Sequence, residues 1–256
     1  MVPALLMRGM LIGILAGLLA FGFARIFGEP PVELAIALEG GPSHSHGHGD
    51  AGQAHGDAEE PELVSRAVQS GLGLLTGAVV YGAALGGIFA LVFAYAQGRL
   101  GAIGPRGTAA LLALAGFAVI YLVPQIKYPA SPPAVSSPET IGPRTALYLS
   151  MVLFSLAAAV AALAGGRRAA RVLGLWNGAI LGGGLYLGAV TAAMLALPAV
   201  NEMPAEFPAA LLWDFRLAAV GMQGVLWTAL GLGFGLLAER RLGSAGIRRP
   251  GLAQAV

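Results

Sequence analysis

The sequence contains no cysteine and a single lysine, Lys127. Without thiols the chain can form no disulfide bond, thiolate metal site or cysteine nucleophile, so any metal must be held by nitrogen and oxygen ligands. Neither a phosphate loop of the GxxxxGK type nor a nucleotide-binding domain is present, which excludes ATP hydrolysis by this chain. No catalytic triad, pair of buried carboxylates or cofactor motif appears either, so the sequence does not predict an enzyme.

Charged residues are also scarce, at 11% of the chain, whereas hydrophobic residues make up 57% and the mean hydropathy is +0.76. A soluble domain cannot bury that much apolar surface. Six apolar stretches have roughly the 20 residues needed to cross a bilayer, and their interiors hold no aspartate, glutamate or lysine. They lie at residues 9–28, 70–96, 108–124, 146–164, 173–197 and 217–238.

Backbone polar groups in hydrocarbon must be bonded internally, so these stretches predict α-helices. We expect an all-α, polytopic membrane bundle of about six transmembrane helices, forming one domain over residues 1–256. The third helix is expected to end at Pro124. The first stretch also has features of a signal peptide, with Arg8 before the apolar run, and its cleavage would leave five helices with the same sidedness.

The basic residues predict an orientation with both termini in the cytoplasm. This orientation places ten basic residues inside and five outside. The inner set is Arg8, Arg99, Arg106, Arg167, Arg168, Arg171, Arg240, Arg241, Arg248 and Arg249, and the outer set is Arg25, Arg66, Lys127, Arg144 and Arg216. Twelve of the thirteen acidic residues fall outside, and only Glu239 inside. Either the negative outer surface concentrates cations, or acids simply accumulate where basic residues are excluded.

The first outer loop, residues 40–62, is rich in histidine and acidic residues and holds all four histidines of the chain. Neutral imidazole is a common ligand for Zn, Ni, Cu and Co, and flexible Gly/Ser spacing lets several imidazoles reach one ion. The candidate metal ligands are His44, His46, His48, His55, Asp50 and Asp57. The alternative is a solvated low-complexity loop without metal. Ligand type alone leaves Cu, Ni, Zn and Co open.

Ionisable residues also gather where the first helix leaves the membrane, at Arg25, Glu29, Glu33 and Glu39. Charges at a membrane boundary are costly unless they are paired or hydrated. Arg25 with Glu29 or Glu33 is therefore a candidate gate where the ion enters, and interfacial anchoring is the alternative.

A proline-rich outer loop spans residues 124–144, with five prolines from Pro124 to Pro138. These prolines predict a stiff extended cap rather than a regular helix. Gln125, Lys127 and Tyr128 could line an entrance, or they could simply mark the membrane interface.

Glycine pairs at four-residue spacing predict close contacts between helices. They are Gly9/Gly13/Gly17, Gly73/Gly77, Gly82/Gly86, Gly178/Gly182, Gly184/Gly188 and Gly231/Gly235, although several would arise by chance among 39 glycines. The polar residues Thr76, Asn177 and Gln223 could face a path or bond neighbouring helices.

Several segments together carry a family resemblance. They are Gly28-Glu-Pro with Glu33 and Glu39, the histidine loop, the run from Pro124 to Val135 with Thr140-Ile and Arg144-Thr, and the closing Trp213-Asp-Phe-Arg216. Over most of its length the chain resembles the CbtA family of probable cobalt transporter subunits, which are small bacterial membrane proteins. The resemblance implies cobalt uptake linked to cobalamin synthesis, with a small single-span partner of the CbtB type. It brings no established ion pathway.

The sequence and the resemblance together predict a subunit for divalent metal uptake in a bacterial plasma membrane. Cobalt is the expected cargo, with Ni²⁺ and Zn²⁺ as alternatives and no tightly bound cofactor. Lipid and the single-span subunit are the expected partners, and nucleic acid is not. The alternative function is a metal-binding accessory or structural membrane protein without transport activity of its own.

Overall fold

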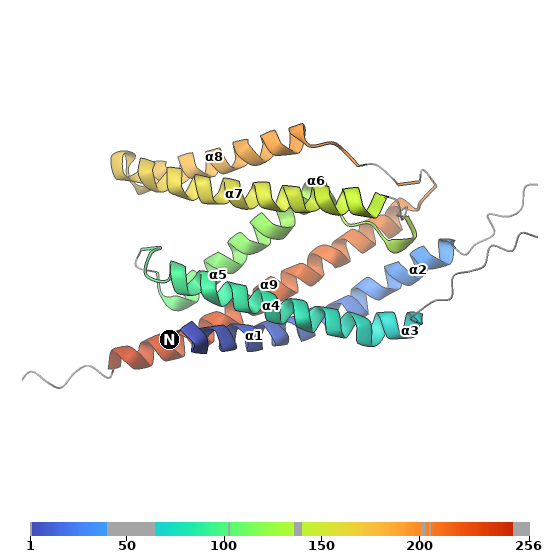
Figure 1. The fold of residues 1–256 in the computed structure, drawn as a ribbon, viewed down its shortest axis with the longest axis horizontal. Helices are drawn as coiled ribbons and strands as arrows, with labels where there is room; N and C mark the ends of the chain where they lie inside the picture. The colour runs from blue at the N-terminus through green and yellow to red at the C-terminus, as the bar shows by residue number, and fades with distance from the viewer. Residues whose placement is uncertain are drawn as a thin grey trace, which may run out of the picture.

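The computed structural model of the chain describes residues 2–39, 65–101, 103–135, 140–200, 203–204 and 206–247. In this part of the chain, long helices run roughly along the longest axis of the molecule (Figure 1). Six helices are long and apolar enough to cross a membrane: Pro3–Leu38, Arg66–Ala96, Pro105–Lys127, Ile141–Leu173, Leu175–Ala196 and Ala209–Arg240. The prediction of an all-α bundle with six apolar helices is confirmed.

Three of these six helices contain a π-helical segment. The first consists of α1 (Val2–Phe23), η1 (Ala24–Gly28) and α2 (Glu29–Glu39); the second of α3 (Arg66–Val68), η2 (Gln69–Gly73) and α4 (Leu74–Ala96); the third of α5 (Pro105–Gly116), η3 (Phe117–Leu122) and α6 (Val123–Lys127). A short 3₁₀ turn, η4 (Pro133–Val135), precedes α7 (Ile141–Leu173), α8 (Leu175–Ala196) and α9 (Ala209–Ile247).

The first and third helices are longer than the sequence predicted. The first continues past Pro30 and Pro31 to Glu39, and the third does not end at Pro124 but reaches Lys127. A proline ring normally clashes with the carbonyl four residues earlier and ends or kinks a helix. All three prolines lie just after a π-helical segment, whose wider i→i+5 turns relieve that clash.

The core of the bundle lies between α1, α4, α5 and α9. α1 packs on α4 and α9, and α5 packs on α9. The buried cluster in this core includes Phe89 and Phe93 of α4 with Trp227, Leu230 and Phe234 of α9. Phe234 meets Phe89 and Phe93 edge-on, with ring centroids 5.5 and 4.9 Å apart. These two ring contacts join α4 to α9, and the same buried cluster contains alanines of α1 and α5: Ala16, Ala20, Ala109 and Ala113.

Glycines bring the backbones of α1 and α4 into direct contact. A Cβ atom at Gly13 would collide with the carbonyl oxygen of Gly82, and one at Gly86 would collide with that of Gly9. Such close approach is available only to residues without a side chain. In contrast, nothing lies within 4 Å of a Cβ built at Gly188. Some of the predicted glycine pairs therefore lie at a contact between two helices, whereas others lie on a helix face with no neighbour within 4 Å.

The hairpin of α7 and α8 forms a second layer. The two helices pack mainly on each other, through Gly166 on α7 and Gly178 and Gly182 on α8. Gly174 alone joins them and has a positive φ of 84°, which favours glycine. α8 is the least buried of the six long helices, as expected for a helix at the outside of the bundle (Figure 1).

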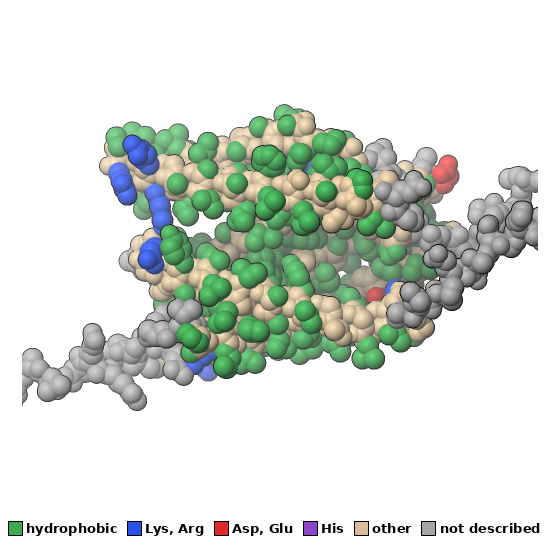
Figure 2. All heavy atoms as spheres, viewed as in Figure 1, with side chains coloured by type: hydrophobic (Ala, Val, Ile, Leu, Met, Phe, Trp, Pro, Cys, Tyr) green, Lys and Arg blue, Asp and Glu red, His purple; other side chains and the backbone are tan. Residues whose placement is uncertain are grey.

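The chain connections fall at two ends of the molecule (Figure 1). We call one of them the loop end. It contains the end of α2, the start of α3, the residue 128–135 segment and the α8–α9 connection. The other, the basic end, carries the start of α1, the α4–α5 and α7–α8 connections and the end of α9. Lys and Arg side chains gather visibly at the basic end in Figure 2.

Candidate functional site

An ion pair links the two helices that flank the residue 40–64 segment. Glu29, the first residue of α2, is buried, and its Oε2 atom lies 2.7 Å from Nη2 of Arg66, the first residue of α3. The carboxylate side chain is only 10% exposed, whereas that of the guanidinium is 36% exposed. The pair therefore shields a carboxylate that would otherwise be costly to keep ionised away from water.

The sequence suggested Arg25 with Glu29 or Glu33 as a candidate gate, with interfacial anchoring as the alternative, and the structure pairs Glu29 with Arg66 instead. Arg25 lies within η1 and is exposed, and it makes no ion pair with another described side chain. Glu33 is exposed as well. Residues four apart lie above one another in an α-helix, but the wider turns of η1 change this alignment between Arg25 and Glu29.

The candidate metal ligands of the sequence lie outside the described residues. They are His44, His46, His48, His55, Asp50 and Asp57. Glu39 ends α2, but its side chain also lies outside the described part. Within the described part, no group of three or more His, Cys, Asp or Glu residues is placed to hold a metal ion.

The proline-rich segment folds over the loop end and is held there by hydrogen bonds. The Tyr128 hydroxyl donates to the carbonyl oxygen of Pro198 at 2.8 Å, and Nε of Arg216 donates to the carbonyl oxygen of Ala130 at 3.2 Å. A tyrosine hydroxyl is protonated at neutral pH and can donate, and desolvation raises the pKa of Tyr128 further. The segment contains a helical stretch and the 3₁₀ turn η4, rather than being extended throughout.

Of the predicted entrance residues, Gln125 is buried, while Lys127 and Tyr128 are half-buried. Only Tyr128 of these three lines the pocket that the segment helps to enclose. This pocket was not predicted from the sequence, because its walls come from segments that are distant in the chain.

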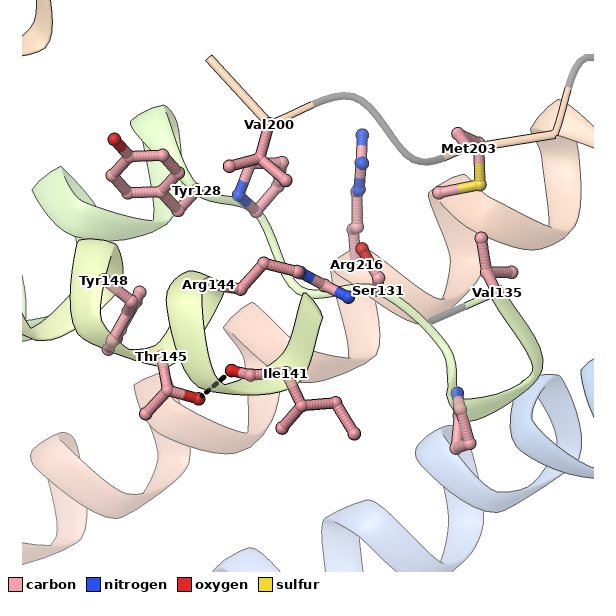
Figure 3. Close-up of a pocket in the computed structure, with 12 residues that line it drawn as sticks. Tyr128, Ser131, Val135, Ile141, Arg144, Thr145, Tyr148, Val200, Met203 and Arg216 are labelled. Carbon is pink, nitrogen blue, oxygen red and sulfur yellow. Dashed lines mark hydrogen bonds between the residues drawn. The ribbon is translucent and has the colours of Figure 1, made fainter. Parts of the chain in front are cut away.

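The pocket has a volume of about 540 Å³ and lies beneath the proline-rich segment, between α7 and α9. Figure 3 shows Arg144 extending from α7 toward Ser131, with Arg216 on α9 nearby and Tyr148 deeper along α7. No acidic residue is among the described residues that line it. Two guanidinium groups suit an anionic or hydroxyl-bearing group better than a bare dication.

At the basic end, described arginines tie the layers of the bundle together. Nη2 of Arg167 donates to the carbonyl oxygen of Arg99 at 2.8 Å, which joins α7 to the α4–α5 connection. Arg106 at the start of α5 forms an ion pair with Glu239 of α9. Of the three polar residues considered in the sequence, Thr76 is exposed on α4. Asn177 donates to Leu173 at 3.0 Å, which is a bond within its hairpin, and the Gln223 side chain bonds Tyr81.

The comparisons with known proteins give one family. A family model described as "Probable cobalt transporter subunit (CbtA)" matches residues 2–239, which cover all but the last residue of the six described helices that could cross a membrane. No curated protein and no solved structure matches the chain. The match confirms the resemblance seen in the sequence, with cobalt as the probable transported ion and partner subunits implied by the word subunit. This integral membrane protein belongs to the CbtA family of probable cobalt transporter subunits.

Proposed function

We propose that this chain takes up Co²⁺ across a bacterial plasma membrane and captures the ion with its outer histidine loop. The observation that carries the proposal is the family match over residues 2–239, on a bundle of six apolar helices. The ligands are His44, His46, His48 and His55, assisted by Asp50 and Asp57. Several imidazoles on a flexible segment can close around one borderline cation.

The captured ion then passes to the carboxylates at the exit of the first helix. Glu29, Glu33 and Glu39 precede the loop, and Arg66 follows it. The Glu29–Arg66 pair supports this role because it keeps both attachment points of the loop at the same end of the bundle. A dication arriving at Glu29 competes with Arg66 for the carboxylate. Arg25 lies about one turn nearer the membrane along η1, and its side chain is exposed.

The membrane potential is sufficient to drive this entry. With the loop end outside and the basic end in the cytoplasm, as the basic residues favour, an inside-negative potential contributes about 2.3 kcal/mol per charge per 100 mV. The two charges of Co²⁺ therefore gain about 4.6 kcal/mol. Neither ATP hydrolysis nor an enzymatic step by this chain is needed. A small single-span partner of the CbtB type completes the transporter.

The experiment that tests the function is Co²⁺ uptake by proteoliposomes, with and without the single-span partner. A variant with His44, His46, His48 and His55 all changed to Ala should lose uptake at low cobalt and recover it at high cobalt, because only capture is impaired. A matched variant with Ser43, Ser45 and Gln53 changed to Ala keeps the imidazoles and should behave as wild type. Absence of flux in every sample, even with the partner, would leave an accessory or structural role.

A further inference from the structure

Four neutral polar side chains from four different helical segments gather within the membrane-spanning part of the bundle. They are Tyr81 on α4, Tyr121 on η3, Tyr148 on α7 and Gln223 on α9. The Tyr81 hydroxyl is hydrogen-bonded to the Gln223 side chain. Tyr121 and Tyr148 lie close enough to Tyr81, and to each other, for their phenol groups to interact electrostatically. We call these four residues the tyrosine–glutamine cluster.

The amide oxygen of Gln223 in this cluster has no partner. Its Oε1 atom is buried and makes no hydrogen bond with the described residues. A buried carbonyl oxygen without a donor costs free energy, so native structures usually satisfy such atoms with water or an ion. The Gln223 amide oxygen, which is the negative end of the amide dipole, is therefore available to bind a cation. Asn177, the other amide named from the sequence, differs because its side chain already bonds the backbone of its own hairpin.

The cluster consists of side chains that carry no formal charge, although Arg144 lies one helical turn from Tyr148. The interiors of the apolar stretches contain no aspartate, glutamate or lysine. Tyr148 also lines the inner part of the loop-end pocket (Figure 3), so the cluster continues inward from that pocket. The guanidinium groups of Arg144 and Arg216 line the pocket itself, whereas the side chains of the cluster are neutral oxygen and nitrogen groups.

The cluster also bridges two layers of the bundle. Tyr81 belongs to the layer of α1 and α4, and Tyr148 to the layer of α7 and α8. Figure 2 shows the molecule hollowed between α4 and α7 on the face in view. Polar groups along a hollow between packed layers admit water, which an apolar wall would exclude.

We propose that the tyrosine–glutamine cluster is an intramembrane binding station for the transported divalent cation, which rests there partly hydrated on the Gln223 amide oxygen and the phenol oxygens. The inference rests on the proposed function. Neutral oxygens replace part of the hydration shell without holding the ion as strongly as carboxylates would, and a path requires binding weak enough for the ion to leave. Co²⁺ accepts such oxygen ligands in addition to imidazole.

Cysteine accessibility tests the station without depending on net transport. The natural chain has no cysteine, so single cysteines can be introduced at Tyr81 or Tyr148 of the full chain in proteoliposomes and treated with a charged, membrane-impermeant thiol reagent. The matched control is Leu153→Cys, because Leu153 lies on α7 and its side chain is exposed on the apolar surface of the bundle. If the binding station is hydrated, the rate of thiol modification should be about tenfold or more higher at the cluster cysteines than at Leu153→Cys. The reason is that thiolates, the reactive form, are disfavoured in hydrocarbon.

Protection by the metal identifies the ligand. Co²⁺ should slow modification of the Tyr148→Cys variant, and the further change Gln223→Leu should remove that protection, because the amide oxygen is then absent. Cluster cysteines that react as slowly as the Leu153→Cys control would overturn the proposal. So would protection that persists unchanged after Gln223→Leu.

Uptake supplies the second measurement and separates the two proposals. Gln223→Leu should lower Co²⁺ uptake at limiting cobalt by about tenfold, the effect of losing one good polar contact to an ion. The control Tyr186→Phe also removes a membrane-embedded hydroxyl, but Tyr186 bonds Ser155 between α7 and α8 at 2.9 Å and should leave uptake near wild type. Normal Co²⁺ uptake by the Gln223→Leu variant would contradict the binding-station proposal but not the proposed transport function. A wild-type chain without uptake in the presence of its partner overturns the proposed function, while accessibility still decides whether the cluster binds Co²⁺.

Discussion

Glu29 and Arg66 show how one ion pair can be fixed by the fold rather than by local sequence. The residues are 37 positions apart, and the 40–62 loop lies between them. Arg25, only four positions from Glu29, was the nearer candidate and is exposed. Sequence distance therefore favoured the wrong partner, because the direction in which each side chain leaves its helix depends on η1 and η2.

Arg66→Ala should destabilise the protein by about 1–3 kcal/mol, because it leaves the buried Glu29 carboxylate without its charged partner. Thermal unfolding of the detergent-solubilised protein, followed by tryptophan fluorescence, measures this effect. Arg25→Ala is the control and should leave the midpoint unchanged. The exchanged pair Glu29→Arg with Arg66→Glu should regain part of the lost stability, and equal midpoints for Arg66→Ala and wild type would contradict the pairing.

At the scale of elements, the three π-helical segments occupy the half of the bundle toward the loop end. η1 leads directly into Glu29, η2 follows Arg66 by two residues, and η3 carries Tyr121. π-helical turns are uncommon and are frequently found at functional sites, where they redirect side chains. In this protein they adjoin the ion pair and the tyrosine–glutamine cluster, and two of them also allow prolines inside continuous helices.

Helix packing predicts unequal effects for two similar glycine substitutions. Gly13→Leu should destabilise the protein by about 1–3 kcal/mol or more, because its Cβ meets the Gly82 carbonyl and α1 must move away from α4. Gly188→Leu on α8 meets open space and should change stability by less than about 0.5 kcal/mol. The fraction of protein that remains monodisperse in detergent after heating measures both. Equal losses in the two variants would contradict the packing described for α1 and α4.

At the scale of the whole molecule, charge is divided between the two ends of the bundle. Arg99, Arg106, Arg167 and Arg168 lie at the basic end, whereas the loop end carries the acidic residues Glu29, Glu33, Glu206 and Asp214 together with five basic ones: Arg25, Arg66, Lys127, Arg144 and Arg216. Cytoplasmic loops of membrane proteins carry an excess of arginine and lysine. The division therefore favours an orientation with the loop end outside, where a histidine loop would meet the metal.

Single cysteines at the two ends test this orientation in intact cells. Glu206→Cys, at an exposed position of the loop end, should react with an impermeant maleimide added outside. Ile103→Cys, at an exposed position of the α4–α5 connection, should react only after the cells are permeabilised. The reverse pattern of labelling would invert the topology and would place the histidine loop in the cytoplasm.

Composition by itself determined the class of this protein. With 57% hydrophobic and 11% charged residues, the chain must place most of its length in a membrane, and backbone hydrogen bonding then requires helices. The histidine loop and the unequal distribution of arginine are likewise properties of the linear sequence. The number of apolar helices and the family could therefore both be inferred before the structure was known.

Only the tertiary structure decided which residues meet. Glycine spacing was the same at Gly9/Gly13 and at Gly184/Gly188, yet only the first pair touches another backbone. Gln223 was one of several polar candidates until the fold set its side chain beside Tyr81 of α4. The physical reason is that a helix repeats its faces every few residues, so a sequence states what each face contains, whereas the packing of neighbouring helices decides which face is covered, which is left open and which lines a path.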